Sequence, residues 1–236
     1  MIIYPAIDLR SGKVVRLKEG DPTRMTAYSD DPTETARRWL GMGATWLHVV
    51  NLDGAFGESD GTNRSALESI LKLGAQVQFG GGMRSVDAIE NAIALGVSRV
   101  VLGTISIEQP KVVEAALRKF GAEKIAVGID ARDGLVRVRG WKDNSGISAT
   151  DLALQMRTVG LGTVIFTDIR RDGLGSGLNI PSTRELADVS GLDVIASGGV
   201  HTLDDVMAAR DANLAGVIIG RALYEGTIDL EKALQV

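Results

Sequence analysis

A sequence pattern that recurs after about half the chain restricts the fold more than any other feature of these 236 residues. Residues 7–14 read IDLRSGKV, and residues 129–136 read IDARDGLV, 122 positions later. Three shorter matches keep the same order at offsets of 119, 117 and 117: Asp53-Gly54 with Asp172-Gly173, Gly81-Gly82 with Gly198-Gly199, and Gly103 with Gly220. Such ordered matches indicate two similar half-domains, about residues 1–120 and 121–236, rather than a likeness that merely reflects alternating elements.

Short apolar, β-branched runs alternate along the chain with longer stretches whose apolar residues have helical spacing. We expect strands at residues 2–8, 45–52, 77–80, 99–103, 124–130, 163–168, 193–197 and 216–220, and helices at 33–40, 64–73, 86–95, 111–120, 148–159, 182–189 and 203–211. Eight strands separated by helices favour a closed barrel over an open doubly wound sheet. The sequence therefore predicts one α/β domain over residues 1–236, a (β/α)8 TIM barrel with a two-fold internal half-barrel repeat. The repeated Ser/Asp-Gly elements predict small hairpins after the first and fifth strands.

Composition excludes several classes of protein. The chain has no cysteine and only two histidines, so thiolate and histidine-rich metal sites are not expected. The formal net charge of −4 argues against a nucleic-acid surface, and no apolar run reaches the roughly 18 residues of a membrane span. The first residues lack the basic start and cleavage site of a signal peptide. We expect a cytoplasmic monomer that binds no metal, nucleic acid or membrane, although backbone amides can still bind an anion.

Glycines and small polar residues follow four of the expected strands, at the end where barrel enzymes place their active sites. They are Gly81, Gly82, Gly103 and Thr104 in the first half, and Ser197, Gly198, Gly199, Gly220 and Arg221 in the second, to which Gly177 from the loop after the sixth strand is added. Glycine lets the backbone approach a ligand closely, and loops after strands seven and eight frequently form a phosphate site. A single glycine pair would be explained by a tight turn. The repeated arrangement predicts two phosphate sites, and hence an elongated small-molecule bisphosphate substrate.

Carboxylates end or follow several strands. A carboxylate after an apolar strand is costly to bury unless it is paired or used, and Asp8 and Asp130 are equivalent by the repeat. We therefore expect both to be catalytic rather than structural, with Thr167 nearby on the sixth strand. Asp172 lies in the sequence RRDG, where a catalytic residue and a solvated turn residue are equally good interpretations.

Other polar residues have less decisive surroundings. His48 lies inside an apolar strand and is expected to be a packed histidine, and His201 is expected in a loop or at a helix start. The polar stretch at residues 16–31 is typical of a loop that covers a substrate, and Arg16 is a candidate ligand contact or an ordinary surface arginine. Trp141 either stacks on a flat heterocycle or covers the barrel rim.

Several segments taken together resemble the ProFAR isomerases of histidine biosynthesis, over essentially the whole chain. The matching segments are PAIDL (5–9), VRL (15–17), GD (20–21), YSDDP (28–32), LDGA (52–55), QFGGGMR (78–84), GT (103–104), GID (128–130), TDI (167–169), RDG (171–173), ASGGV (196–200) and ALY (222–224). Two departures stand out: Asn51 replaces a frequent Asp, and LGSGLN at 174–179 replaces a stiffer, proline-containing loop.

The resemblance implies an Amadori rearrangement of an aminoaldose bisphosphate to the aminoketose, with neither metal nor redox cofactor. It implies that Asp8 is the general base, that Asp130 or Asp172 is the general acid, and that Thr167 donates a hydrogen bond to the reacting sugar. Two carboxylates suffice for such chemistry when their surroundings separate their pKa values.

Three alternatives remain on the sequence. The RGW at residues 139–141 is similar to the dual-specificity relatives that also isomerise phosphoribosyl anthranilate in tryptophan biosynthesis. The sister cyclase typically begins with a cysteine-containing strand, which this chain lacks. A non-catalytic sensor of phosphorylated ligands on the same fold is the third alternative, but an anion binder gains nothing from carboxylates at its mouth.

Overall fold

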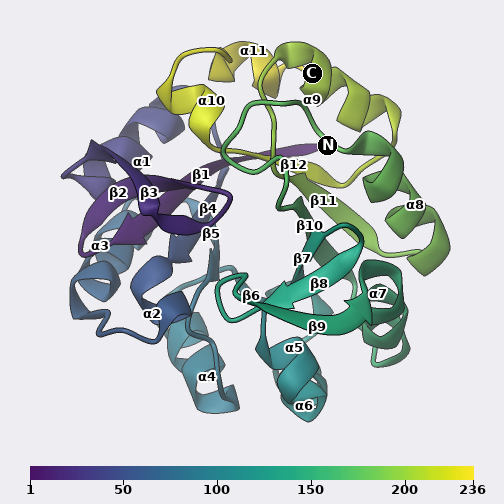
Figure 1. The fold of residues 1–236 in the computed structure, drawn as a ribbon. Helices are drawn as coiled ribbons and strands as arrows, with labels where there is room; N and C mark the ends of the chain where they lie inside the picture. Colours follow the sequence, from purple (N-terminus) through teal and green to yellow (C-terminus); the bar gives the residue numbers. More distant parts are fainter.

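Eight parallel strands form a closed barrel in the computed structural model, which describes residues 1–236 (Figure 1). The strands are β1 (Ile2–Arg10), β4 (Trp46–Asn51), β5 (Gln76–Gly80), β6 (Arg99–Leu102), β7 (Ile125–Arg132), β10 (Thr163–Asp168), β11 (Asp193–Ser197) and β12 (Gly216–Ile219). Neighbours pair in parallel in that order, and β12 also pairs with β1, which closes the ring. The predicted (β/α)8 barrel is confirmed.

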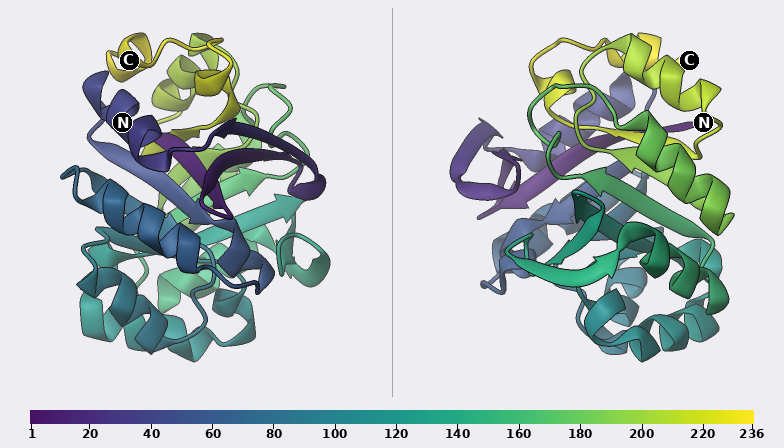
Figure 2. Two further views of the ribbon diagram at one scale, coloured as in Figure 1. Left: turned by 90° about the vertical axis from the view of Figure 1, so that its left-hand side faces the viewer. Right: turned by 45° about the vertical axis from the view of Figure 1, so that its right-hand side comes forward.

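Helices surround the barrel on the outside (Figures 1 and 2). They are α1 (Pro32–Gly41), α2 (Leu52–Phe56), α3 (Gly61–Leu71), α4 (Val86–Ala94), α5 (Ile105–Glu108), α6 (Pro110–Phe120), the 3-10 helix η1 (Ala122–Lys124), α7 (Ala149–Thr158), α8 (Ile180–Ser190), α9 (Leu203–Asp211), α10 (Arg221–Tyr224) and α11 (Leu230–Leu234). Polar side chains begin several of them: the Asp31 carboxylate accepts the amides of Thr33 and Glu34, and Ser85 caps α4. No helix has the length and apolar character needed to cross a membrane.

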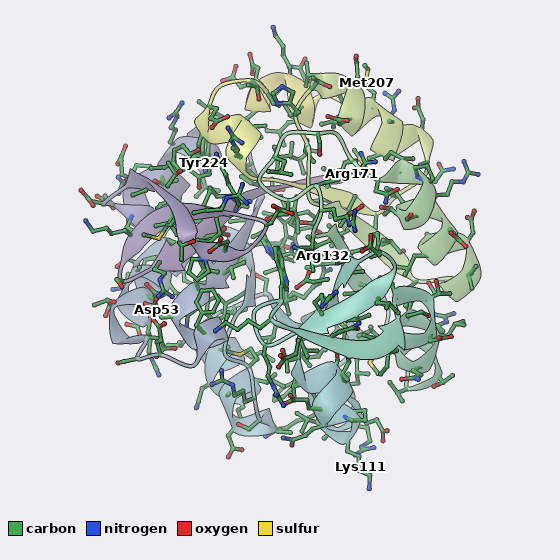
Figure 3. The ribbon with its side chains drawn as sticks, viewed as in Figure 1. Asp53, Lys111, Arg132, Arg171, Met207 and Tyr224 are labelled. Carbon is green, nitrogen blue, oxygen red and sulfur yellow. The ribbon has the colours of Figure 1, made fainter.

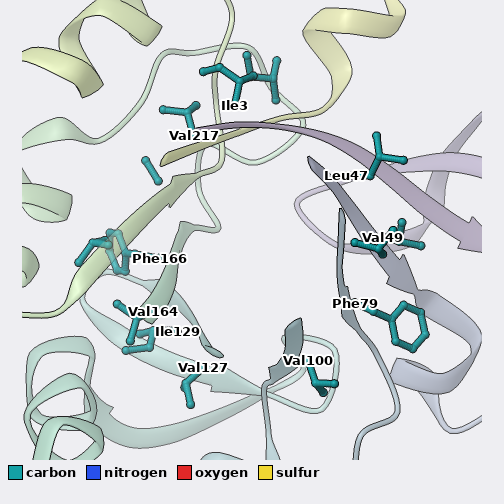
Figure 4. Packing of buried hydrophobic residues seen from close by; sticks show 14 of the residues in the cluster. Ile3, Leu47, Val49, Phe79, Val100, Val127, Ile129, Val164, Phe166 and Val217 are labelled. Atoms are coloured by element: carbon teal, nitrogen blue, oxygen red, sulfur yellow. The ribbon is translucent and has the colours of Figure 1, made fainter. Parts of the chain in front are cut away.

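Side chains of the barrel strands alternate between two apolar regions. A cluster of 49 buried residues fills the space between barrel and helices, and Figure 4 shows part of it. A second, smaller cluster includes Tyr4, Ala6, Ile165 and Ile218 and fills the inside of the barrel. Because Tyr4, Ala6 and Asp8 are two positions apart on β1, the Asp8 carboxylate continues the inner face at the carboxyl end of the strand.

Two antiparallel hairpins leave the barrel at the ends of β1 and β7, as predicted. The first is formed by β2 (Lys13–Lys18) and β3 (Asp21–Ser29), the second by β8 (Leu135–Val138) and β9 (Asp143–Ser148). Parallel strands end on the same side, so both hairpins lie over one mouth of the barrel (Figure 1). The polar stretch after the first strand is thus a hairpin rather than an irregular loop.

Candidate active site

A cavity of about 310 Å³ opens at the carboxyl ends of the barrel strands. Ten of the predicted site residues line it: Asp8, Arg16, Gly81, Gly82, Gly103, Thr104, Asp130, Thr167, Asp172 and Ser197. A smaller pocket adjoins it through Arg16, Asp172 and Ser197, and adds Gly198, Gly199, Gly220 and Arg221. Figure 3 looks into this mouth, with Arg132 and Arg171 near its rim. The structure therefore brings together every predicted site residue except Gly177.

Asp8 lies at the end of β1 and forms an ion pair with an arginine of the first hairpin. Arg16 Nη1 is 2.9 Å from Asp8 Oδ2, and the two side chains are only 11% and 14% exposed. Burial raises the pKa of Asp8, and the Arg16 charge acts in the opposite direction. Arg16 is thus a buried site residue and not a surface arginine.

Asp130 occupies the equivalent position at the end of β7. The Trp141 indole N–H donates a hydrogen bond to its Oδ2 at 2.8 Å, and Thr167 lies opposite Asp130 in the pairing of β10 with β7. Burial raises the pKa of Asp130, while the hydrogen bonds from Trp141 and Thr167 lower it. Trp141 therefore lies in the cavity and holds a carboxyl group.

Asp172 lies in the loop after β10 and reaches the same cavity. Its pKa is raised to about 6, mainly by burial and also by the charges of Asp8 and Asp130, while the Arg16 charge acts in the opposite direction. Its backbone carbonyl accepts a hydrogen bond from Glu19 N at 3.1 Å, which ties this loop to the first hairpin. A carboxyl group that titrates near neutrality can give up a proton during a reaction.

The repeat counterpart of Asp172 has a structural role. Asp53 is buried in α2, to the side of the mouth (Figure 3), and does not line the cavity. Its Oδ2 accepts the Ser11 amide at 2.8 Å and the Asn63 amide nitrogen at 2.9 Å. Asn63 Oδ1 also accepts the Gly12 amide at 2.8 Å. The duplicated Asp-Gly thus anchors a hairpin in one half and reaches the cavity in the other.

Two glycines of the first half, Gly81 and Gly82, have a backbone conformation that other residues rarely adopt. Gly81 and Gly82 have φ angles of +100° and +81°, and a Cβ on Gly81 would overlap the Asn51 carbonyl. Gly103 and Thr104 precede α5, and Thr104 Oγ1 accepts the backbone amide of Arg139 at 2.9 Å. These residues present backbone to the cavity.

The glycines of the second half repeat this arrangement. Gly198 and Gly199 have φ angles of +89° and +95°. Gly177 lines neither pocket. Its N–H donates a hydrogen bond to the Gly199 carbonyl at 2.9 Å, so it supports the Gly198-Gly199 turn from outside the pocket. Arg221 Nη1 donates to the Gly173 carbonyl at 2.8 Å, so its guanidinium holds the loop next to Asp172.

Other residues of the cavity received little weight from the sequence. His48 lines the cavity from β4 with no partner for Nδ1, and burial followed by the Arg16 charge lowers its pKa to about 3. Its imidazole is therefore neutral. His201 lies in the loop before α9, as expected. Sequence reasoning assigned no role to three further cavity residues, Phe56, Arg84 and Arg137, of which only Arg84 lies in a segment that carries the resemblance.

Comparison with known proteins gives a consistent result. A family model described as "Histidine biosynthesis protein" matches residues 2–229. A curated protein from Syntrophobacter fumaroxidans is 47% identical over 99% of this chain and 92% of its own length. One from Desulfitobacterium hafniense (strain Y51) is also 47% identical, over 100% of this chain and 97% of its own length. One from Roseobacter denitrificans is 46% identical over 100% of this chain and 98% of its own. All three are named 1-(5-phosphoribosyl)-5-((5-phosphoribosylamino)methylideneamino)imidazole-4-carboxamide isomerase. This chain belongs to the histidine biosynthesis protein family.

Proposed function

We infer that this chain is the isomerase of histidine biosynthesis that converts ProFAR to its aminoketose form. One observation carries the inference from the structure: three largely buried carboxyl groups converge on one cavity, which is lined by glycines of the first half and adjoins a second pocket lined by glycines of the second half. The names of the full-length relatives point to the same reaction.

The two glycine-lined pockets suit a substrate with a phosphate at each end. Gly81, Gly82, Gly103 and Thr104 would hold one phosphate through backbone groups, and Ser197, Gly198, Gly199 and Gly220 the other. Such binding places the aminoribose between them, over the carboxyl groups. Binding energy from both ends can then be used to orient the reacting sugar.

Asp172 is proposed as the general acid and Asp8 as the general base. Asp172, with its pKa near 6, gives a proton to the ring oxygen of the aminoribose as the C1–O bond breaks, which leaves a Schiff base. Asp8 removes the proton at C2. The electron pair of the broken C2–H bond then forms the C1–C2 double bond of an enolamine. Protonation at C1 and loss of the C2 hydroxyl proton complete the aminoketose. The rearrangement moves no electrons into or out of the substrate, so it needs no redox cofactor, and we propose that the carboxyl groups carry the proton transfers without a metal.

Asp130 and Thr167 are proposed to bind the sugar hydroxyls beside the reacting carbons. The Trp141 indole N–H donates a hydrogen bond to one oxygen of Asp130, which fixes the orientation of the carboxyl group. A role for Asp130 as the acid is the alternative, and the pH profile of variants distinguishes the two.

The proposal also covers the domain organisation, the oligomeric state and the cellular location of the protein. We propose that residues 1–236 act as one domain made of two half-barrels, and that the protein works as a monomer in the cytoplasm on a small-molecule substrate. The fit of both phosphate pockets within one chain supports the monomer.

One experiment tests the proposal directly. The purified protein, dialysed against a chelator, is mixed with ProFAR, and the C1 proton of the aldose is followed by NMR. We expect the aldose signal to disappear and the C1 methylene of the ketose to grow without any addition. A protein that binds ProFAR and leaves it unchanged would be a sensor, contrary to the proposal.

A further inference from the structure

Arg137 on β8 is the one arginine of the main cavity whose side chain has no partner. Its Nε is shielded from solvent without a hydrogen bond, and its guanidinium makes no ion pair. The other three are held within the protein, Arg16 by Asp8, Arg84 by the Gly54 carbonyl, and Arg139 by Glu108 and Asp143. Buried polar groups are rarely left unpaired, and each exception calls for a physical explanation.

The backbone directs Arg137 towards the mouth of the barrel. Residues directly opposite one another in an antiparallel pair share a face. Ala131 and Val136 are such a pair, and both belong to the apolar core outside the barrel. Their neighbours Asp130 and Arg137 therefore share the opposite face, which carries the catalytic carboxyl groups. The end of β8 is fixed next to the first-half glycines, because the amide of Arg139 donates to Thr104.

Charge balance also singles out this residue. The second-half pocket has two arginines in its lining, Arg16 and Arg221. The first-half residues Gly81, Gly82, Gly103 and Thr104 bring no charge. Arg139 lies close by, but Glu108 and Asp143 already neutralise it. Among the arginines of the main cavity, only Arg84 and Arg137 have no carboxylate partner, and Arg84 already donates to the Gly54 carbonyl. Guanidinium is the group best suited to a phosphate, and Arg137 is the one that has no partner at all.

The two hairpins of the internal repeat carry their arginines at different positions. Each hairpin returns over its catalytic carboxylate, Asp8 in the first half and Asp130 in the second. Arg137 is 122 positions after Val15, the neighbour of Arg16. The repeat therefore aligns Arg137 with Val15 and Arg16 with Val138, so the second hairpin carries its arginine one position earlier than the first. Arg16 pairs with Asp8, whereas Trp141 occupies Asp130 and leaves Arg137 free.

We propose that Arg137 binds the substrate phosphate held by Gly81, Gly82, Gly103 and Thr104, and so supplies the counter-ion of the first-half site. The assignment rests on the bisphosphate isomerase function proposed above. Arg137 touches a remote group and not the reacting carbons. Its loss should therefore weaken binding of ground state and transition state alike, which raises KM and leaves kcat nearly unchanged.

The test compares Arg137→Gln with the wild-type chain on three substrates: ProFAR and the two analogues that each lack one phosphate. On ProFAR we expect KM to rise about 10–100-fold and kcat to stay within about threefold. One of the two monophosphates should be handled equally well by both proteins, because the phosphate that Arg137 binds is missing from it. Arg157→Gln is the matched control, since it removes the same charge from an exposed position on α7.

The outcomes separate this proposal from the proposed function. Wild-type protein that leaves ProFAR unchanged would refute the function itself. An active wild type with an unchanged KM in Arg137→Gln, or an equal loss on all three substrates, would refute the role of Arg137 alone. If Arg137→Gln does not fold, Arg137→Lys keeps a charge on the hairpin. The lysine variant should retain the preference for ProFAR over the same monophosphate, and losing it entirely would also refute the role.

Discussion

The Arg16 guanidinium lies 2.9 Å from the Asp8 carboxylate, and its charge also lowers the pKa of Asp172. One buried cation therefore acts on both groups that we propose as base and acid. Asp8 forms the direct ion pair, which opposes the rise that burial causes in its pKa. Asp172 lacks that contact, and its pKa of about 6 lets it hold a proton near neutrality. One arginine therefore stabilises the charged form of both carboxyl groups against the effect of burial, through a direct ion pair with Asp8 and without one to Asp172.

Replacement of Asp8 by Asn should abolish turnover and leave the affinity for ProFAR within roughly tenfold, because loss of a general base costs rate rather than uniform binding. Turnover is measured by NMR and affinity by calorimetry on the same folded preparation. Substantial turnover in Asp8→Asn would remove Asp8 from the role of base.

Comparison of Asp172→Asn with Asp130→Asn should identify the general acid. We expect Asp172→Asn to reduce kcat on the order of 10²–10⁴-fold. In the wild type, the rate should fall as pH rises above about 6, because Asp172 loses the proton that it must donate. This basic limb should disappear only in Asp172→Asn. Its loss in Asp130→Asn instead would assign the acid to Asp130, and normal rates in both variants would refute the two-carboxylate mechanism.

The raised pKa of Asp172 should also reduce the stability of the folded chain at neutral pH. The folded state binds this proton more tightly than the unfolded state, so stability falls as pH rises from about 4 to 6 and then stays lower. The shift corresponds to roughly 3 kcal/mol at most. Asp172→Asn should therefore be more stable than the wild type at pH 7.5, and the gain should vanish near pH 4. Urea unfolding at both pH values measures it, and an equal gain at both would contradict the titration of Asp172.

The barrel and the pairing of its glycines could be predicted because both depend on local, repeated signals. Alternation of apolar strands and amphipathic helices fixes the architecture. The glycines recur at equivalent strand ends in both halves. Asp8 and Asp130 could be placed in the mouth for the same reason, since each continues the inner face of its strand.

The sequence could not show that Asp172 lines the cavity and Asp53 does not, because their positions depend on contacts with residues elsewhere in the chain. Asp53 is turned away from the cavity by Ser11 and Asn63, 42 and 10 positions away. The place of Trp141 has a similar origin. Arg139, Gly140 and Trp141 have successive φ angles of +55°, +66° and +68°. Two of these three left-handed residues are not glycine, so their conformation cannot be inferred from residue type. No local pattern gives this conformation.

Two anion sites should be visible in crystals soaked in phosphate or sulfate. One anion should lie beside Gly82 and Gly103, and the other beside Gly199 and Gly220, each held mainly by backbone N–H groups. Anomalous scattering from selenate in place of sulfate would confirm both positions. Density at a single position would favour a substrate with one phosphate, as in the anthranilate reaction.

The protein should have little or no activity on phosphoribosyl anthranilate. That substrate carries one phosphate and a carboxylate, and the carboxylate needs a cation of its own, apart from Arg137, which we have assigned to a phosphate. Arg139 is the candidate that the resemblance to dual-specificity relatives offers, but its guanidinium is paired with Glu108 at 2.8 Å and Asp143 at 3.3 Å, and its side chain is 65% exposed. To reach the carboxylate, Arg139 would have to break both pairs, and Trp141 would have to leave Asp130.

Growth complementation provides the measurement, with one strain that lacks the histidine-pathway isomerase and one that lacks the tryptophan-pathway isomerase. We expect rescue of the first strain alone. Rescue of both at equal expression would contradict the prediction, and Arg139→Ala should then abolish tryptophan rescue while histidine rescue persists. Glu108→Gln is an informative companion, because it frees Arg139 from its shorter ion pair. If the pairing of Arg139 is what prevents the second activity, this variant should gain weak growth on the tryptophan-deficient strain.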